Sequence, residues 1–495
     1  MKRLAVACSL AVFAVLLLAV AVAQAGGPVI DLGSSEEDLR VVGINALDYL
    51  GEVASGDING DGLDDLIIGA SGFDAMTPTR TNAGAAYVFW GTSGRLTGTV
   101  DLDSTSADLT VYGPGVTYAL GRFVAAGDIN GDGVDDLLMG ADYASVDGYT
   151  RNGAVYVLFG SSSLSGTVDL YTDTADVTVY GAASYDHLGR SLASCDVSGD
   201  GIPDLIMGAY QYDQSAGVDG SGAVYVIFGG TSLSKTIQLD SGGADFTILG
   251  DDPGDRLGRS VACGDVDGDG TADIIAGAYR ADQTWGSDAG EVYVIYGGST
   301  LSGTLDLSTT APDVLLRGVG AGDEAGFYVA SGDLNGDGTD DLLIGAYRAD
   351  VDWPNSETGT AYVIYGGSLS ATMNLSETAD VTIYGAAQDD RLSRSLTSGD
   401  FNGDGYDDLL MGAPLADVTT RTNAGTSYVI YGAPDLTSTI YLSSTNLVSI
   451  KVLGDDIDDQ AGRASGAGDL DGDGADDLII GAVLAGGTDS GETYV

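Results

Sequence analysis

The residues whose chemistry is clearest are aspartates in a nine-residue pattern that occurs seven times. The first copy, Asp-Ile-Asn-Gly-Asp-Gly-Leu-Asp-Asp, begins at Asp57, and the others begin at Asp128, Asp196, Asp265, Asp333, Asp400 and Asp469. Positions 1, 3 and 5 carry Asp or Asn in every copy except at Ser198, and position 9 is always Asp. Ca²⁺ takes about six to eight oxygen ligands, mostly from carboxylates and carbonyls. The pattern therefore predicts seven calcium loops.

Each loop offers ligands at positions 1, 3, 5, 7 and 9, where position 7 lends its backbone carbonyl oxygen and its side chain varies. The predicted ligands are Asp57, Asn59, Asp61, Leu63, Asp65, Asp128, Asn130, Asp132, Val134, Asp136, Asp196, Ser198, Asp200, Ile202, Asp204, Asp265, Asp267, Asp269, Thr271, Asp273, Asp333, Asn335, Asp337, Thr339, Asp341, Asp400, Asn402, Asp404, Tyr406, Asp408, Asp469, Asp471, Asp473, Ala475 and Asp477. The loop at Asp196 is expected to bind most weakly because of Ser198. An Asp/Gly turn without metal is the alternative, but seven empty cages of carboxylates would repel themselves. Mg²⁺ fits less well because it demands a rigid octahedron.

The elements that must position these loops are short strands. The seven copies recur every 67 to 71 residues, and each repeat contains four β-branched or aromatic runs bounded by Gly, Asp and Ser. Such runs are typical of strands, and a fixed period of this length indicates a repeat architecture. We therefore expect an all-β fold, a seven-bladed β-propeller of four-stranded blades. An open β-solenoid is the alternative.

Two further elements flank the loops. A Leu-Gly-like pair precedes each loop, at Leu50-Gly51, Leu120-Gly121, Leu188-Gly189, Leu257-Gly258, Ala325-Gly326, Leu392-Ser393 and Ala461-Gly462. A Gly-Ala pair follows each loop, at Gly69-Ala70, Gly140-Ala141, Gly208-Ala209, Gly277-Ala278, Gly345-Ala346, Gly412-Ala413-Pro414 and Gly481-Ala482. The repeats resemble FG-GAP repeats, as in the integrin alpha-subunit propeller, although none keeps the Phe-Gly and one keeps the Pro. The resemblance implies a seven-bladed propeller with calcium on one face and an extracellular setting.

The chain divides into two regions. Residues 1–25 have a basic start, an apolar stretch and an Ala-Gln-Ala site, which predicts a cleaved signal peptide. Residues 26–495 form the propeller. The last repeat stops after its third strand, so residues 28–43 are expected to complete the seventh blade with residues 460–495 and close the ring, since an unpaired edge invites aggregation. The alternative is that the chain is a piece of a longer protein.

Composition excludes several classes of protein. There are 73 acidic and 19 basic residues, a net charge of -54, which would repel nucleic acid. His187 is the single histidine, which limits histidine chemistry, and it is expected to be a solvated loop residue. Cys195 and Cys263, the two cysteines after the leader, are too few for a disulfide framework and are expected to be small buried side chains.

We therefore expect an exported or cell-surface, monomeric calcium-binding propeller. It would serve as an adhesion, interaction or surface-structural module for a protein or glycan partner, with no membrane span after the signal peptide. No catalytic constellation is visible, and no cofactor other than Ca²⁺ (up to seven ions) is expected. The alternative is an extracellular hydrolase built on the propeller, or the non-catalytic propeller of a larger secreted enzyme, since 65 aspartates always offer carboxylate pairs.

A ligand patch is expected on the face away from the metals. Loops between the second and third strands of two neighbouring repeats carry Trp285 and Trp353, and each begins with a Tyr-Arg pair, Tyr279-Arg280 and Tyr347-Arg348. Tryptophan and arginine are common anchors of binding hot spots. The alternative is that the two tryptophans pack over their own loops.

Overall fold

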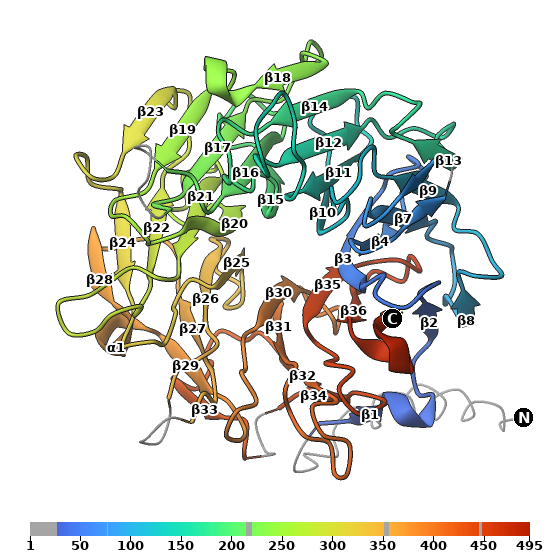
Figure 1. Cartoon of the computed structure of the whole chain (residues 1–495). Helices are drawn as coiled ribbons and strands as arrows, with labels where there is room; N and C mark the ends of the chain where they lie inside the picture. Colours follow the sequence, from blue (N-terminus) through green and yellow to red (C-terminus); the bar gives the residue numbers. More distant parts are fainter. Residues whose placement is uncertain (1–26, 77, 214–219, 351–355, 445–447) are drawn as a thin grey trace, which may run out of the picture.

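Seven small sheets stand around a central axis, which confirms the predicted seven-bladed propeller (Figure 1). The computed structural model describes residues 27–76, 78–213, 220–350, 356–444 and 448–495, so the predicted signal peptide lies outside the described residues. Helical structure in these ranges is limited to short turns, namely η1 (Leu32–Ser34), η2 (Leu239–Ser241), α1 (Leu375–Thr378) and η3 (Ala485–Asp489). None of these described helices is long and apolar enough to cross a bilayer.

The strands of each blade follow one another outward from the axis, apart from a small hairpin of β5 (Ala75–Met76) and β6 (Thr79–Arg80). The innermost strands are β3 (Leu50–Gly56), β10 (Phe123–Gly127), β15 (Ser191–Cys195), β20 (Leu257–Gly264), β25 (Tyr328–Gly332), β30 (Ser395–Gly399) and β35 (Ala464–Gly468). The second strands are β4 (Asp65–Ala70), β11 (Asp136–Ala141), β16 (Asp204–Ala209), β21 (Asp273–Ala278), β26 (Asp341–Ala346), β31 (Asp408–Ala413) and β36 (Asp477–Ala482). The third strands are β7 (Ala85–Phe89), β12 (Ala154–Leu158), β17 (Ala223–Ile227), β22 (Glu291–Ile295), β27 (Thr360–Ile364), β32 (Thr426–Ile430) and β37 (Glu492–Tyr494). The fourth strands are β9 (Leu109–Tyr112), β14 (Val177–Tyr180), β19 (Phe246–Leu249), β24 (Val314–Arg317), β29 (Val381–Tyr384), β34 (Ile450–Leu453) and β2 (Leu39–Val42).

Each sheet also has a fifth, outermost strand, which corrects the prediction of four-stranded blades. These strands are β13 (Gly166–Asp169), β18 (Thr236–Gln238), β23 (Gly303–Asp306), β28 (Thr372–Asn374), β33 (Thr439–Tyr441), β1 (Val29–Asp31) and β8 (Gly98–Asp101). Each one belongs to the next repeat in the ring and pairs in parallel with the fourth strand of the blade before it, as β13 does with β9. Every blade is therefore fastened to its neighbour by a strand of that neighbour.

The N-terminal segment closes the ring at two places. The strand β2 pairs with β37 and completes the seventh blade, as predicted. The strand β1, by contrast, pairs with β34 of the sixth blade, so the first part of residues 28–43 does not join the seventh blade as expected. Arg40 secures the closure through ion pairs with Glu492 (2.6 Å) and Asp455 (3.1 Å). The N-terminal segment therefore pairs with both the sixth blade, through β1, and the seventh blade, through β2.

The core lies between neighbouring blades. Second strands are buried on both sides because each packs against the blade before and the blade after it, which explains their continuous apolar runs. One such cluster joins Ile67 and Val88 of the first blade to Leu137 and Met139 of the second. This packing holds the ends of the inner strands, and hence the acidic loops, in fixed places.

Candidate metal centre

All seven acidic loops connect an innermost strand to its second strand, so they lie on one face of the ring, the metal-loop face. The loops from second to third strands lie on the opposite face. In every loop the carboxylate at position 1 accepts backbone N–H groups from positions 5 and 6; at Asp57 these come from Asp61 (2.9 Å) and Gly62 (2.8 Å). The turn requires a left-handed backbone at Gly60 and Gly62, whose φ angles are 74° and 90°. Position 1 thus holds the loop in its shape.

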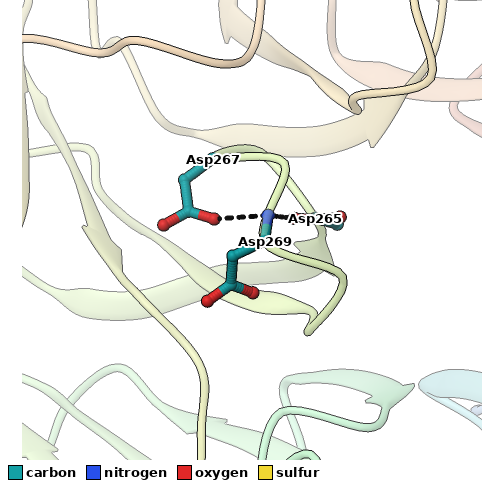
Figure 2. Close-up of side chains that lie close together, drawn as sticks. All are labelled: Asp265, Asp267 and Asp269. Carbon is teal, nitrogen blue, oxygen red and sulfur yellow. Dashed lines mark hydrogen bonds between the residues drawn. The ribbon is translucent and has the colours of Figure 1, made fainter.

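Three carboxylates converge in the loops that carry Asp at positions 1, 3 and 5. The oxygens of Asp265, Asp267 and Asp269 lie within 4.8 Å of one another (Figure 2), as do those of Asp469, Asp471 and Asp473. Two oxygens bound to one Ca²⁺ are separated by at most about 5 Å, which is twice the Ca–O distance. The donor set therefore fits a calcium ion. Four other loops supply an amide oxygen at position 3, and the loop at Asp196 supplies Ser198 instead.

Position 9 is a buried anchor in six of the loops and is partly buried, at Asp477, in the seventh. Asp65 is fully buried, and its carboxylate accepts N–H groups from Ile58 (2.9 Å), Asn59 (3.1 Å) and Gly91 (2.9 Å). Burial raises the pKa of Asp65 to about 7, although the backbone donors oppose the shift. Burial likewise raises the pKa of Asp273 to about 7 and that of Asp477 to about 6. The negative charges of Asp469, Asp471 and Asp473 raise the pKa of Asp477 further, so a cation bound among them would also offset the charge of position 9.

Sequence reasoning missed the role of position 8. Asp340 accepts the backbone N–H of Asp265 in the preceding blade (2.9 Å) and donates its own N–H to the carbonyl oxygen of Asp265 (3.0 Å). The same two-point contact joins Asp135 to Asp57, Asp407 to Asp333 and Asp476 to Asp400. We call it the carboxylate lock. Its signal was an Asp at position 8 in five of the seven loops.

The carboxylate lock needs a glycine in the preceding blade. A Cβ atom on Gly264, the residue before Asp265, would lie 2.5 Å from Oδ2 of Asp340. Glycine holds this place in six blades, and Cys195 holds it in the third. The fourth blade carries Ala272 at position 8, so no carboxylate competes with the Cys195 side chain.

Cys195 instead forms a disulfide with Cys263 of the fourth blade. The expectation of two small buried thiols was therefore wrong. The backbone half of the lock survives here, because Ala272 donates its N–H to the carbonyl oxygen of Asp196 (3.2 Å). At this junction a covalent bond replaces a hydrogen-bonded carboxylate.

The residues of the predicted ligand patch differ in their exposure and in their partners. Trp285 is 52% exposed on the opposite face, whereas Trp353 lies outside the described residues. The Arg280 guanidinium lies over its neighbour Tyr279 (5.5 Å). Arg348 forms ion pairs with Glu324 (3.0 Å) and Glu357 (2.7 Å), and Tyr347 packs on Phe327 (4.2 Å between ring centroids). Of the described members, Trp285 and Arg280 are exposed, whereas Tyr347 and Arg348 are engaged by neighbouring side chains.

His187 also departs from expectation. It is 4% exposed, and its ring lies between Tyr143 (5.2 Å) and Tyr210 (5.7 Å) rather than in solvent. Its Nδ1 atom is 3.8 Å from a carboxylate oxygen of Asp142. The side chain is therefore part of the packing beneath the opposite face.

The comparison with protein families agrees with the blades just described. The FG-GAP repeat family matches residues 51–89, 120–158, 188–227, 257–295, 325–364 and 393–430. Each match runs from the start of an innermost strand, through the acidic loop, to the third strand. The chain is an FG-GAP repeat protein. The seventh acidic loop, at Asp469, has the same pattern and lies in a blade of the same topology.

The relatives of this FG-GAP protein include phospholipases and integrin alpha subunits. It is 35% identical over 158 residues to phosphatidylinositol-glycan-specific phospholipase D of Bos taurus, covering 32% of this chain and 18% of that protein. It is 33% identical over 178 residues to integrin alpha pat-2 of Caenorhabditis elegans, covering 34% of this chain and 14% of that protein. The chain thus aligns with about a fifth or less of these relatives. A solved rhamnogalacturonan lyase, YesX, aligns with 90% of this chain and 72% of its own at 13% identity, with a TM-score of 0.34, which says nothing about activity.

Proposed function

We propose that the chain is an exported, calcium-stabilised propeller that acts as a non-catalytic interaction module for a surface protein or glycan. The observation that carries the calcium part is the convergence of carboxylates at positions 1, 3 and 5 in the loops at Asp265 and Asp469. Ca²⁺ would bind these oxygens and relieve their repulsion, so metal binding would add to the free energy of unfolding. The likeness to integrin alpha subunits supports this proposal.

The opposite face is the proposed binding surface. Calcium ions would rigidify the metal-loop face, whereas the opposite face presents the exposed Trp285 on a loop between β21 and β22. An exposed indole offers a large rigid contact for a protein side chain or a sugar ring.

A glycan array and a panel of surface proteins test this surface. Trp285→Ala should weaken binding at least tenfold without changing the melting temperature. Tyr171→Ala is the matched control, because Tyr171 is a similarly exposed aromatic (57%) at the outer rim, just after β13. Equal binding by the two variants would contradict the proposal.

A hydrolase is the second candidate, favoured by relatives that are named phospholipase D. The aligned part covers a fifth of those proteins, so this chain would correspond to one segment of such an enzyme. An activity screen of the purified chain with phosphodiester and glycan substrates, in calcium, separates the two candidates. Turnover that survives purification to homogeneity would favour the enzyme.

A further inference from the structure

Arginines recur at one position around the axis of the propeller. The residue after the Gly or Ser of the Leu-Gly-like pair lies one residue before the innermost strand in five blades and is the third residue of β3 and β20, so in each blade it stands near the end of the strand away from the metal-loop face. Five blades place an arginine there, and we call these five the arginine ring: Arg122, Arg190, Arg259, Arg394 and Arg463. The two remaining blades have Glu52 and Phe327. Because the innermost strands surround the axis (Figure 1), these seven residues meet at the centre of the opposite face.

The guanidinium groups of different blades lie close together. The guanidinium carbon of Arg259 is 4.2 Å from the centroid of the Phe327 ring, and that of Arg394 is 4.6 Å from the same ring. Three consecutive blades thus meet on one benzene ring. Burial lowers the pKa of Arg259, and the positive charges of Arg190 and Arg394 lower it further. Burial lowers the pKa of Arg394 to about 10, with added repulsion from Arg463 and Arg190.

Four of the five arginines lack an ion-pair partner among the described residues, although the chain has 73 acidic residues. In the described ranges, no carboxylate oxygen lies within 4.0 Å of the guanidinium nitrogens of Arg190, Arg259, Arg394 or Arg463. Two arginines farther from the axis, Arg348 and Arg391, are by contrast paired with Glu357. Within the ring, Arg122 approaches Asp142 (3.5 Å).

An unpaired buried charge is costly, and Arg259 is only 6% exposed. The stacking of Arg259 and Arg394 on Phe327 recovers only part of this cost. Glu52 offsets part of the charge of Arg394 and Arg463, but it is one carboxylate against five arginines at this position. The cluster therefore favours a partner that brings negative charge to the axis.

We propose that the arginine ring binds an oxyanion group, a carboxylate, sulfate or phosphate, presented along the axis from the opposite face. The inference rests on the proposed interaction function and names the chemistry of the group that is bound. Guanidinium groups match such oxyanions through paired hydrogen bonds. The net charge of -54 disfavours long polyanions, so the ligand carries one or two anionic groups on an otherwise neutral body.

Sulfate is the probe that tests the ring. Titration calorimetry and melting curves use the full chain in 1 mM calcium, with inorganic sulfate compared against sodium chloride at equal ionic strength. Sulfate binding should give a calorimetric heat that fits one site per chain, and sulfate should raise the melting temperature above that in chloride. N-acetylglucosamine 6-sulfate is the second probe. An affinity equal to that of inorganic sulfate would show that the site recognises the sulfate group alone, and a higher affinity would show that it also recognises the sugar.

The double variant Arg259→Gln and Arg394→Gln should weaken sulfate binding at least tenfold. Arg95→Gln is the control, because Arg95 is an exposed arginine at the outer rim (73% exposed side chain) and should leave binding unchanged. Should the double variant fail to fold, Arg463→Gln takes its place, with a weaker loss. No difference between sulfate and chloride, or a variant that binds sulfate like the parent, would overturn the anion site. The calcium dependence of stability and the effect of Trp285→Ala would be untouched, so the proposed function fails separately.

Discussion

The junction between the third and fourth blades offers a test of how this ring is held together. We consider a variant in which Cys195→Gly and Cys263→Ser remove the disulfide, and a second in which Ala272→Asp is added. The first gives the junction the glycine and serine found at Gly264 and Ser331 of the next junction. The second supplies the missing carboxylate, which should accept the N–H of Asp196 as Asp340 accepts that of Asp265 (2.9 Å).

The magnitude follows from the chain that the disulfide closes. The two cysteines are 68 residues apart, for which the loss of loop-closure entropy in the unfolded chain is worth about 4 kcal/mol. A chain of this length changes its unfolding free energy by about 1 kcal/mol per kelvin near the melting temperature. Removing the disulfide should therefore lower the melting temperature by about 4 °C. The restored carboxylate lock, a charged hydrogen bond, should return about 1.5 to 3 °C.

Melting curves in calcium, recorded with and without reductant, measure both steps. The control adds Ala272→Asp to Cys195→Ser and Cys263→Ser. In that background no recovery is expected, because a Cβ at residue 195 fills the place of the new carboxylate, as it would beside Asp340 (2.5 Å). Recovery in the serine background equal to that in the glycine background would refute the reasoning. So would a disulfide-free variant that melts like the parent chain.

Three further outcomes are expected. Ser198→Asp should tighten calcium binding at that loop on the order of tenfold, because a carboxylate replaces a hydroxyl; an unchanged calcium titration by calorimetry would count against the ligand assignment. Arg40→Ala should lower the free energy of unfolding by about 2 kcal/mol, because it breaks the ion pairs at the ring closure. Deletion of residues 26–43 should lower the melting temperature or produce oligomers, which light scattering detects. A deletion variant that stays monomeric and keeps the parent melting temperature would show that the closure is dispensable. In chelator, the melting temperature should fall from pH 5 to pH 8. Burial raises the pKa of Asp186 and Asp255 to about 7 in the folded protein, from about 4 in the unfolded chain, so the stability gained from their protonation is lost as the pH rises. A melting temperature that climbs over this range would contradict the assignment.

Most of the fold could be predicted because several independent sequence signals recur with the same period. Seven acidic loops, the flanking Leu-Gly-like and Gly-Ala pairs and the strand patterns agree in phase. The missing fourth strand of the last repeat likewise predicted that β2 would close the ring. The fifth strands escaped notice, because three- or four-residue runs such as Gly98–Asp101 pair with a blade that is remote in sequence.

Contacts between repeats were harder to predict than contacts within them. Cys195 and Cys263 are one repeat apart, so they stand at nearly equivalent places in neighbouring blades, and this spacing could have predicted their bond. His187 was expected in solvent because it sits in a connecting loop, but Tyr143 and Tyr210, which enclose its ring, come from two different blades. Such packing depends on the angle between blades, which no single repeat encodes.

The central claim is that the acidic loops bind calcium and that this binding stabilises the ring. Native mass spectrometry of the chain, followed by melting curves in millimolar calcium and in strong chelator, tests it most directly. We expect up to seven bound Ca²⁺ ions and a melting temperature that is clearly higher in calcium than in chelator. A chain that binds no calcium and melts at the same temperature in both conditions would contradict the account.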